Sequence, residues 1–208
     1  MPVHLDVWSD YVCPFCYLEE PVLTRMQEEF GEELKIRWRA FELRPEPVPT
    51  LPPHGEYLVN IWERAVYPMA RERGMNLKLP PLQPRSRLAL EAVEFARGQE
   101  KFDVMHAAIF RAFFEGGRDI GELKTLLDLG EECGLERASL ENALTTGKFR
   151  ARVLEDEELS AALGVSGVPA MLLRRDDEPL SAARSLSGAQ ADFMVRAAIQ
   201  HLLRNPAA

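Results

Sequence analysis

Apolar and polar residues alternate at the start of the chain, and this alternation then gives way to a helical period. In residues 3–9 (VHLDVWS) every second residue up to Val7 is Val or Leu, and a period of two predicts a strand. From Cys13 to about Phe30 apolar residues recur at every fourth position, which predicts a helix. Residues 34–41 (LKIRWRAF) alternate again, so this part of the chain predicts one βαβ unit.

The middle of the chain has a different character. Residues 44–53 (RPEPVPTLPP) contain five prolines, which exclude a regular helix and predict a stiff, extended connection. Between about 56 and 163 several helical patterns follow, separated by glycines and prolines; one has its apolar positions at Met105, Ile109, Ala112 and Phe113. This block predicts an all-helical segment.

Strands return after Gly164. Residues 168–174 (VPAMLLR) form a short apolar run with a proline near its start, where a strand tolerates one. A turn is expected at 176–179, a weaker strand at about 181–187 and a final helix after Gly188. We therefore expect an α/β fold in which residues 1–44 and 164–208 form one domain and residues 45–163 form an inserted helical domain.

The charge balance limits the kinds of partner that the chain can bind. Its 208 residues include 25 lysines and arginines and 33 aspartates and glutamates, for a net charge of −8. An acidic chain offers no electrostatic footprint for nucleic acid or an anionic membrane, so we expect neither as a partner. No apolar run reaches the roughly 18 residues of a membrane span, and the first residues lack the basic start of a secretory signal. We expect a cytoplasmic protein.

Two cysteines stand where the first strand passes into the first helix, in the sequence Cys13-Pro14-Phe15-Cys16. Residues three apart on a helical turn are close enough for a disulfide to open and close with little backbone movement. Cys13 is expected at the helix N-cap, where free N–H groups and the helix dipole favour a thiolate. We expect Cys13 to attack a substrate disulfide or, when oxidised, to be attacked by a substrate thiol. Cys16 is expected to resolve the mixed disulfide.

A zinc or iron–sulfur half-site is the alternative interpretation of this pair. The chain has three cysteines and four histidines, and no second paired motif accompanies the CxxC, whereas a structural zinc site needs four ligands. We therefore expect redox chemistry with no metal and no cofactor. Cys133, the third cysteine, is expected to be an inert thiol in the helical block, with a third redox cysteine as the alternative.

The residues from Val7 to Pro21 resemble the active-site region of thioredoxin-fold proteins. The CPxC pair together with a large helical insertion resembles the DsbA family, and more narrowly its FrnE-like branch. Residues 164–170 (GVSGVPA) resemble the cis-proline loop of that family, and residues 41–45 (FELRP) and 113–120 (FFEGGRDI) resemble stretches of the branch. The resemblance covers nearly the whole chain and implies a thioredoxin-like fold (βαβ…ββα).

This resemblance implies a cis Val168–Pro169 peptide packed beside Cys13. Such a loop lets the backbone of Val168 hold an extended peptide as an added strand, so Pro14, Phe15, Val168 and Pro169 are the expected substrate-binding residues. The dipeptide between the cysteines is Pro-Phe rather than one with histidine. Without that positive neighbour we expect a less oxidising couple than that of periplasmic DsbA.

The resemblance also implies a buried carboxylate near the resolving cysteine, at the position that Val7 occupies here. Asp10 is the better substitute for it and Asp6 the weaker one, with a loop-capping role as the alternative for Asp10. Glu19 and Glu20 are expected on a solvated helix face. Three aromatic residues lie near the thiols in the sequence. We expect Trp8 in the core, and Tyr11 and Phe15 either in an apolar lip for substrate or in packing.

These features predict a thiol–disulfide oxidoreductase that acts on protein or peptide disulfides and dithiols, with glutathione or a thioredoxin-type protein as a candidate reductant. The alternative enzyme is a glutathione-dependent isomerase or transferase of the 2-hydroxychromene-2-carboxylate isomerase or kappa type, which resembles this chain in layout but usually has serine in place of Cys13. A third possibility is a binding module that uses the scaffold without its thiols.

Overall fold

The computed structural model describes residues 1–204. Its elements follow the order βαβ, then a run of helices, then ββα. The strands and helices are, in chain order, β1 (Val3–Ser9), α1 (Pro14–Phe30), β2 (Leu34–Ala40), α2 (Glu56–Ile61), α3 (Tyr67–Glu72), α4 (Arg87–Arg97), α5 (Phe102–Phe114), α6 (Leu123–Glu132), α7 (Arg137–Thr145), α8 (Arg150–Ala162), β3 (Ala170–Arg175), β4 (Arg184–Ser187) and α9 (Asp192–Arg204). A π-helical stretch, Trp62–Val66, joins α2 to α3.

The four strands form one mixed sheet in the order β2-β1-β3-β4. β1 and β2 run parallel, with Leu5 opposite Ile36. Helix α1 is the crossover connection that brings the chain back, so that β2 starts at the same end of the sheet as β1. β3 is antiparallel to both of its neighbours, β1 and β4. This arrangement is the thioredoxin-like fold, so the expected fold class is confirmed.

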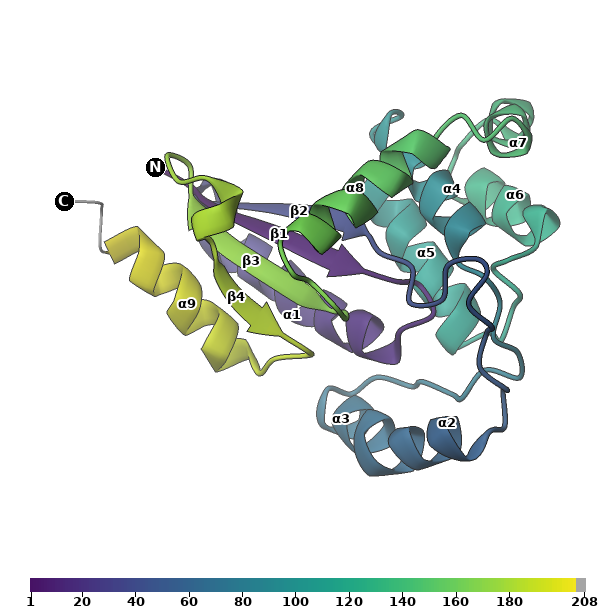
Figure 1. Cartoon of the computed structure of the whole chain (residues 1–208), viewed down its shortest axis with the longest axis horizontal. Helices are drawn as coiled ribbons and strands as arrows, with labels where there is room; N and C mark the ends of the chain where they lie inside the picture. Colours follow the sequence, from purple (N-terminus) through teal and green to yellow (C-terminus); the bar gives the residue numbers. More distant parts are fainter. Residues whose placement is uncertain (205–208) are drawn as a thin grey trace.

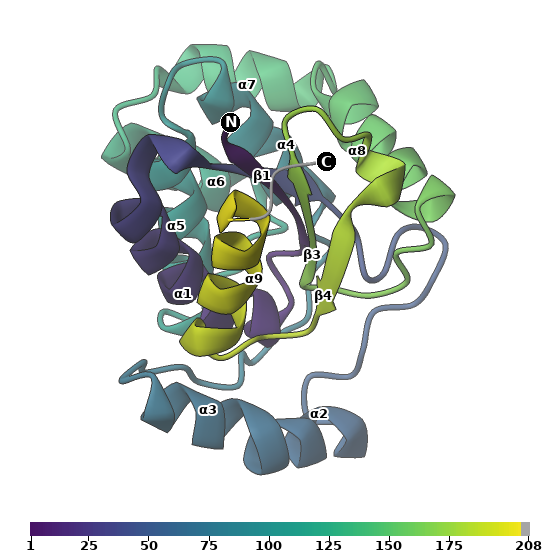
Figure 2. The same ribbon diagram turned by 90° about the vertical axis from the view of Figure 1, so that its left-hand side faces the viewer.

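Helices cover both faces of the sheet (Figure 1, Figure 2). On one face, apolar residues of β1 and β3 pack against α1 and α9, with Val7, Met26 and Ile199 fully buried. On the other face, Trp8 is fully buried beside Leu159 of α8. Trp8 is therefore a core residue, as expected. α8, the last helix before β3, also contributes Asp156, whose side chain accepts the backbone N–H of Ala40 in β2.

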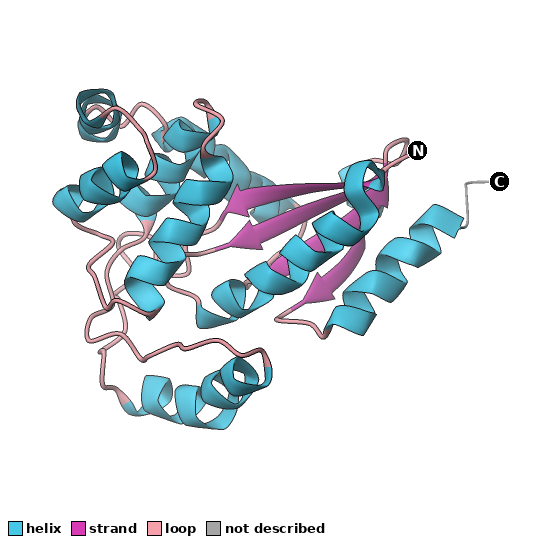
Figure 3. Cartoon of the chain, turned by 180° about the vertical axis from the view of Figure 1, so that it is seen from behind, coloured by secondary structure: helices cyan, strands magenta, loops and turns pink. Residues whose placement is uncertain are grey.

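The helical segment between β2 and β3 is seen from behind in Figure 3. Its core is built from α4 to α7 and includes Phe110, Phe113 and Leu126. The α2–α3 arm, which we define as residues 56–72, lies at one end of the molecule and is reached through extended loops on both sides (Figure 1). The helical insertion is confirmed, whereas its description as a separate domain over 45–163 stays a prediction.

Two details of the expected secondary structure change. The weak strand expected at about 181–187 is shorter, because a 3₁₀ turn occupies Leu180–Ala182 and β4 begins at Arg184. The strand expected from 168 begins at Ala170, after the cis peptide. Among residues 1–204, no helix has the length and apolar character needed to cross a membrane.

Candidate functional site

The dithiol lies where β1 ends and α1 begins. Cys13 is the N-cap of α1 in an extended conformation, and Pro14 occupies the first helical position, where its missing N–H costs nothing. The N–H of Cys13 donates to the carbonyl of Asp10, and the N–H of Cys16 donates to the carbonyl of Cys13, both at 3.1 Å. These hydrogen bonds form a tight turn that holds the two cysteines next to each other. Both cysteines are free thiols, and both are buried.

The two thiols have different surroundings. Cys16 is fully buried, whereas Cys13 is 4% exposed and borders a surface pocket. Burial raises the pKa of Cys16 well above its usual value, and the hydrogen bond that it shares with Cys13 raises it further. The side chain of Ser9 and the backbone of Asp10 oppose this shift through hydrogen bonds to the Cys16 sulfur. Cys16 is therefore a protonated, shielded thiol until Cys13 reacts.

The loop before β3 completes the site from the other end of the chain. The Val168–Pro169 peptide is cis, and the Cys13 sulfur lies 3.5 Å from the carbonyl oxygen of Val168. The expected proximity of this loop to Cys13 is thus confirmed. Its role in binding substrate stays a prediction.

A pocket of about 210 Å³ opens beside Cys13. Its lining is mainly apolar and comes from the dithiol turn, the proline-rich connection, the α2–α3 arm and Val168; it includes Pro14, Phe15, Leu51, Tyr57, Ile61 and Trp62. Pro14 and Phe15 therefore lie where a molecule bound at Cys13 would touch them. The sequence analysis missed the arm as a wall of the site, because no local motif marks it.

Asp10 is fully buried in the loop between β1 and α1. Its carboxylate accepts the N–H of Val12 at 3.3 Å and the N–H of Leu43 at 2.7 Å. Burial raises its pKa to about 6, and hydrogen bonds from Leu43, Ser86 and Val12 limit the shift. The carboxylate thus joins the dithiol loop to the chain after β2, which is the loop-capping alternative; a role in proton transfer stays a prediction.

Asp6, the weaker candidate, is oriented away from the dithiol. It forms an ion pair with Arg39 at 2.6 Å, and Arg39 also binds Asp156 of α8 at 2.7 Å. Val7, at the position implied for the family carboxylate, packs among the apolar residues between the sheet and α1. Asp6 therefore contributes to the attachment of α8.

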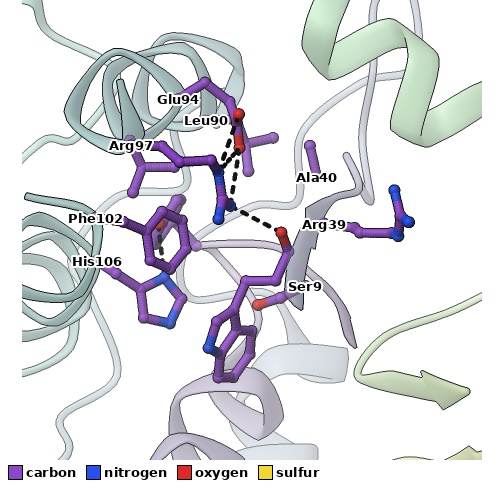
Figure 4. Close-up of a pocket in the computed structure, with 11 residues that line it drawn as sticks. Ser9, Arg39, Ala40, Leu90, Glu94, Arg97, Phe102 and His106 are labelled. Carbon is purple, nitrogen blue, oxygen red and sulfur yellow. Dashed lines mark hydrogen bonds and ion pairs between the residues drawn. The ribbon is translucent and has the colours of Figure 1, made fainter. Parts of the chain in front are cut away.

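Tyr11 is a core residue, so the packing alternative expected for it is the one observed and it forms no apolar lip. Its hydroxyl lies 2.8 Å from Nδ1 of His106, and its ring packs on Phe110. Burial lowers the pKa of His106 to about 3, so the imidazole is neutral at pH 7. Figure 4 shows the small cavity beside this pair, where Arg97 lies between Glu94 and the backbone of β2. Its volume of about 10 Å³ holds about one water molecule.

Glu19 is also buried, which corrects the expected solvated position. It is 0% exposed, accepts the N–H of Gln190 at 2.8 Å and pairs with Arg73 at 3.3 Å. Burial raises the pKa of Glu19 to about 7, against the opposing effects of Gln190 and Arg73. Glu20 is half-buried rather than freely solvated, and burial raises its pKa too. Arg73 has no local sequence signal, since its partners are distant in the chain.

The other groups that carry chemistry lie apart from the dithiol. Cys133 is half-buried at the end of α6, and its sulfur contacts the carbonyl of Val104 at 3.6 Å. Burial and the nearby Glu132 raise the pKa of Cys133, as suits an unreactive thiol. Within residues 1–204, no three side chains of histidine, cysteine, aspartate or glutamate gather in a way that would hold a metal ion.

Comparisons with known proteins agree with this geometry. Residues 4–200 match the family model of the DSBA-like thioredoxin domain. The chain belongs to the DsbA-like thioredoxin family. It is 35% identical to the uncharacterized protein YwbO of Bacillus subtilis (strain 168) over 153 residues, which is 72% of this chain and 76% of YwbO. The chain is thus a member of the DsbA-like thiol–disulfide oxidoreductase family and carries a CxxC motif at Cys13 and Cys16.

Two solved structures resemble the chain along most of its length. The cytosolic disulfide reductase DsbM from Pseudomonas aeruginosa is 25% identical, with a TM-score of 0.73 over 97% of this chain and 98% of DsbM; DsbM has also been solved with GSH. A 2-hydroxychromene-2-carboxylate isomerase is 20% identical, with a TM-score of 0.76 over 97% of this chain and 96% of the isomerase. The isomerase shares the fold, and at this identity the likeness extends no further.

Proposed function

We propose that this protein reduces or isomerises disulfides of protein or peptide substrates through Cys13 and Cys16. The observation that carries the proposal is the placement of the Cys13 sulfur, which lies beside both the Val168 carbonyl and an open pocket, while Cys16 is enclosed behind it. A substrate can therefore reach one thiol of the pair, as dithiol exchange requires. The proposal also assigns the chain to the FrnE-like branch of the family, because residues 41–45 and 113–120 resemble stretches of that branch.

The exchange balances without a cofactor. The thiolate of Cys13 attacks one sulfur of a substrate disulfide, the S–S bond breaks, and the leaving sulfur takes up a proton. Cys16 then loses its proton and attacks the Cys13 sulfur, which releases the second substrate thiol and leaves a Cys13–Cys16 disulfide. The substrate gains two electrons and two protons and the enzyme loses them, so a thiol reductant must restore the dithiol.

The Pro-Phe dipeptide supports the reductive direction of this proposal, and the similarity to DsbM supports both that direction and a cytoplasmic location. Pro-Phe between the cysteines supplies no positive charge next to the thiols, which favours a less oxidising couple. DsbM, a relative at 25% identity, is described as a cytosolic disulfide reductase and has been solved with GSH. We therefore take glutathione, or a thioredoxin-type protein, as the reductant. Two glutathione molecules would give up two electrons and become glutathione disulfide in each cycle.

Other residues take supporting roles in the proposal. Pro14, Phe15, Val168 and Pro169 would contact the substrate. The first three line the pocket next to the reactive sulfur, and Pro169 is joined to Val168 by the cis peptide bond. Asp10 would accept the proton of Cys16 when the mixed disulfide is resolved. Its position supports this role, since its backbone bonds to the Cys16 sulfur and its buried carboxyl has a pKa of about 6.

The decisive experiment compares insulin reduction by the wild type, Cys13→Ser and Cys16→Ser with glutathione as the reductant. We expect no turnover with Cys13→Ser, and a stable enzyme–substrate mixed disulfide with Cys16→Ser, visible by mass spectrometry. A Cys13→Ser variant with full biological activity would instead favour a binding module. Full turnover of an aromatic isomerase substrate by Cys16→Ser with glutathione would favour the isomerase.

A further inference from the structure

The pocket beside Cys13 has the dimensions of a side-chain site. Tyr57, Ile61 and Trp62 of the α2–α3 arm form one wall, and Phe15 and Val168 belong to the other. Pockets that enclose whole small molecules commonly have about 300–1,000 Å³, whereas this one has about 210 Å³. A single large side chain of a bound peptide suits this volume better than an entire small ligand does.

Apolar groups at the mouth of the pocket are open to solvent. Tyr57 is 65% exposed and Leu43 is 38% exposed, and both line the pocket. Exposed apolar groups that gather around a reactive residue mark an interaction surface. A peptide with a large apolar residue next to its cysteine would cover both of these side chains while its disulfide faces Cys13.

One arginine fastens the arm to the part of the fold that holds the thiols. Arg73, which follows α3 directly, donates to the carbonyl oxygens of Leu18 in α1 and Gln190 before α9, the latter at 2.6 Å, and pairs with Glu19 at 3.3 Å. Glu19 also accepts the N–H of Gln190. The guanidinium is thus tied to two separate elements of the thioredoxin-like part of the molecule.

This attachment lies one helical turn beyond the resolving cysteine. Leu18 and Glu19 follow Cys16 in α1, so Arg73 attaches the arm to the same helix that positions the dithiol. The inner face of the arm packs through Leu58 and Trp62 into the helical core. Extended loops enter and leave the arm (Figure 2), and Arg73 stands where the second of them begins. The arm is therefore held on α1 by the contacts of Arg73 and on the helical core by apolar packing.

We propose that Arg73 is a positioning residue that holds the α2–α3 arm against α1, so that the pocket selects disulfide-bearing peptides with a large apolar side chain next to their cysteine. This inference rests on the proposed thiol–disulfide exchange and specifies its substrate class. Lysine at this position keeps the charge but lacks the planar fork that reaches several acceptors at once.

The test uses two synthetic peptides, each with its one cysteine in a mixed disulfide with glutathione, that differ in having Phe or Ser next to that cysteine. We expect the wild type to favour the Phe peptide about tenfold or more in kcat/KM, as the filling of an apolar pocket provides. Arg73→Ala should reduce this preference to about threefold or less through a higher KM for the Phe peptide. The Ser peptide and the reduction potential should be unaffected, and Arg73→Lys should fall between.

Matched variants separate the pocket from general damage to the fold. Tyr57→Ala removes an exposed wall of the pocket and should lower kcat/KM for the Phe peptide alone, whereas Val59→Ala, on the same helix, should change neither peptide. If Arg73→Ala does not fold, Arg73→Lys and Tyr57→Ala decide the question. Equal use of both peptides by the wild type, or an equal loss for both in Arg73→Ala, overturns this inference. Exchange with neither peptide would overturn the proposed function instead.

Discussion

The sulfur of Cys13 lies 3.5 Å from the carbonyl oxygen of Val168, although 155 residues separate the two in the chain. The helix N-cap and the loop before β3 therefore meet at a single sulfur atom. Cys16, in the same helical turn, is fully buried and does not line the pocket that Cys13 borders. This asymmetry assigns the two thiols different reactivities before any substrate binds.

Alkylation of the reduced, folded protein should therefore be selective. We expect iodoacetamide to modify Cys13 at least about tenfold faster than Cys16, because the reactive species is an accessible thiolate and burial raises the pKa of Cys16. Peptide mapping by mass spectrometry over time measures both rates. Cys133, half-buried and with a raised pKa, serves as the internal control and should react slowly. Faster labelling of Cys16 than of Cys13 would reverse the assigned roles.

Replacement of Asp10 tests its proposed role in proton transfer. Burial raises the pKa of Asp10 to about 6, so its carboxylate becomes able to accept a proton as the pH rises through that value. Resolution of the mixed disulfide should accelerate over pH 5–7 in the wild type, and Asp10→Asn should lose this inflection and be slower by about tenfold or more. Stopped-flow measurement of peptide-thiol release gives both results.

Asp6→Asn is the matched control for this experiment. Asp6 is also a buried aspartate, but it pairs with Arg39, which in turn binds Asp156 of α8. The control should therefore retain the inflection. An unchanged pH profile in Asp10→Asn would mean that Asp10 only holds Leu43 and Val12 in the loop.

The parts of the structure that the sequence could predict are those with local patterns. Alternation in residues 3–9 and 34–41 identified β1 and β2, and the CPFC turn located the N-cap of α1. The approach of Val168 to Cys13 came only through resemblance to a family, since nothing in either segment encodes the other.

Burial of charged residues was the least predictable feature. Glu19 lies between Leu18 and Glu20 on α1. Its partners Arg73 and Gln190 are 54 and 171 residues away. Tyr11 likewise meets His106 across 95 residues. Such pairs depend on how the insertion folds back on α1, and a hydrophobic period reports which face of a helix is buried but not which polar partner arrives there.

The attachment of α8 to the sheet provides a prediction about stability. Asp156 is buried, pairs with Arg39 and accepts the N–H of Ala40. Asp156→Ala should lower the free energy of unfolding by about 3–5 kcal/mol, because it leaves a buried arginine with one partner instead of two. Urea denaturation followed by circular dichroism measures this change. Glu29→Ala, which removes an exposed pair with Arg196, should cost at most about 1 kcal/mol; equal losses in the two variants would contradict the argument.

The buried carboxyl of Glu19 predicts a pH-dependent stability. Its pKa rises from 4.5 to about 7 in the folded protein, mainly through burial, so the folded state binds its proton more tightly than the unfolded state does. The contribution of Glu19 to the free energy of unfolding is fully present below pH 4.5 and is lost as the pH rises through about 7. Glu19→Gln stays neutral, so the wild type should lose stability relative to this variant between pH 4.5 and 7.5, by on the order of 3 kcal/mol. Urea titrations of both proteins at the two pH values give this difference. A difference that stays constant with pH would show that the pKa of Glu19 is the same in the folded and unfolded states, so that Arg73 and Gln190 fully offset its burial.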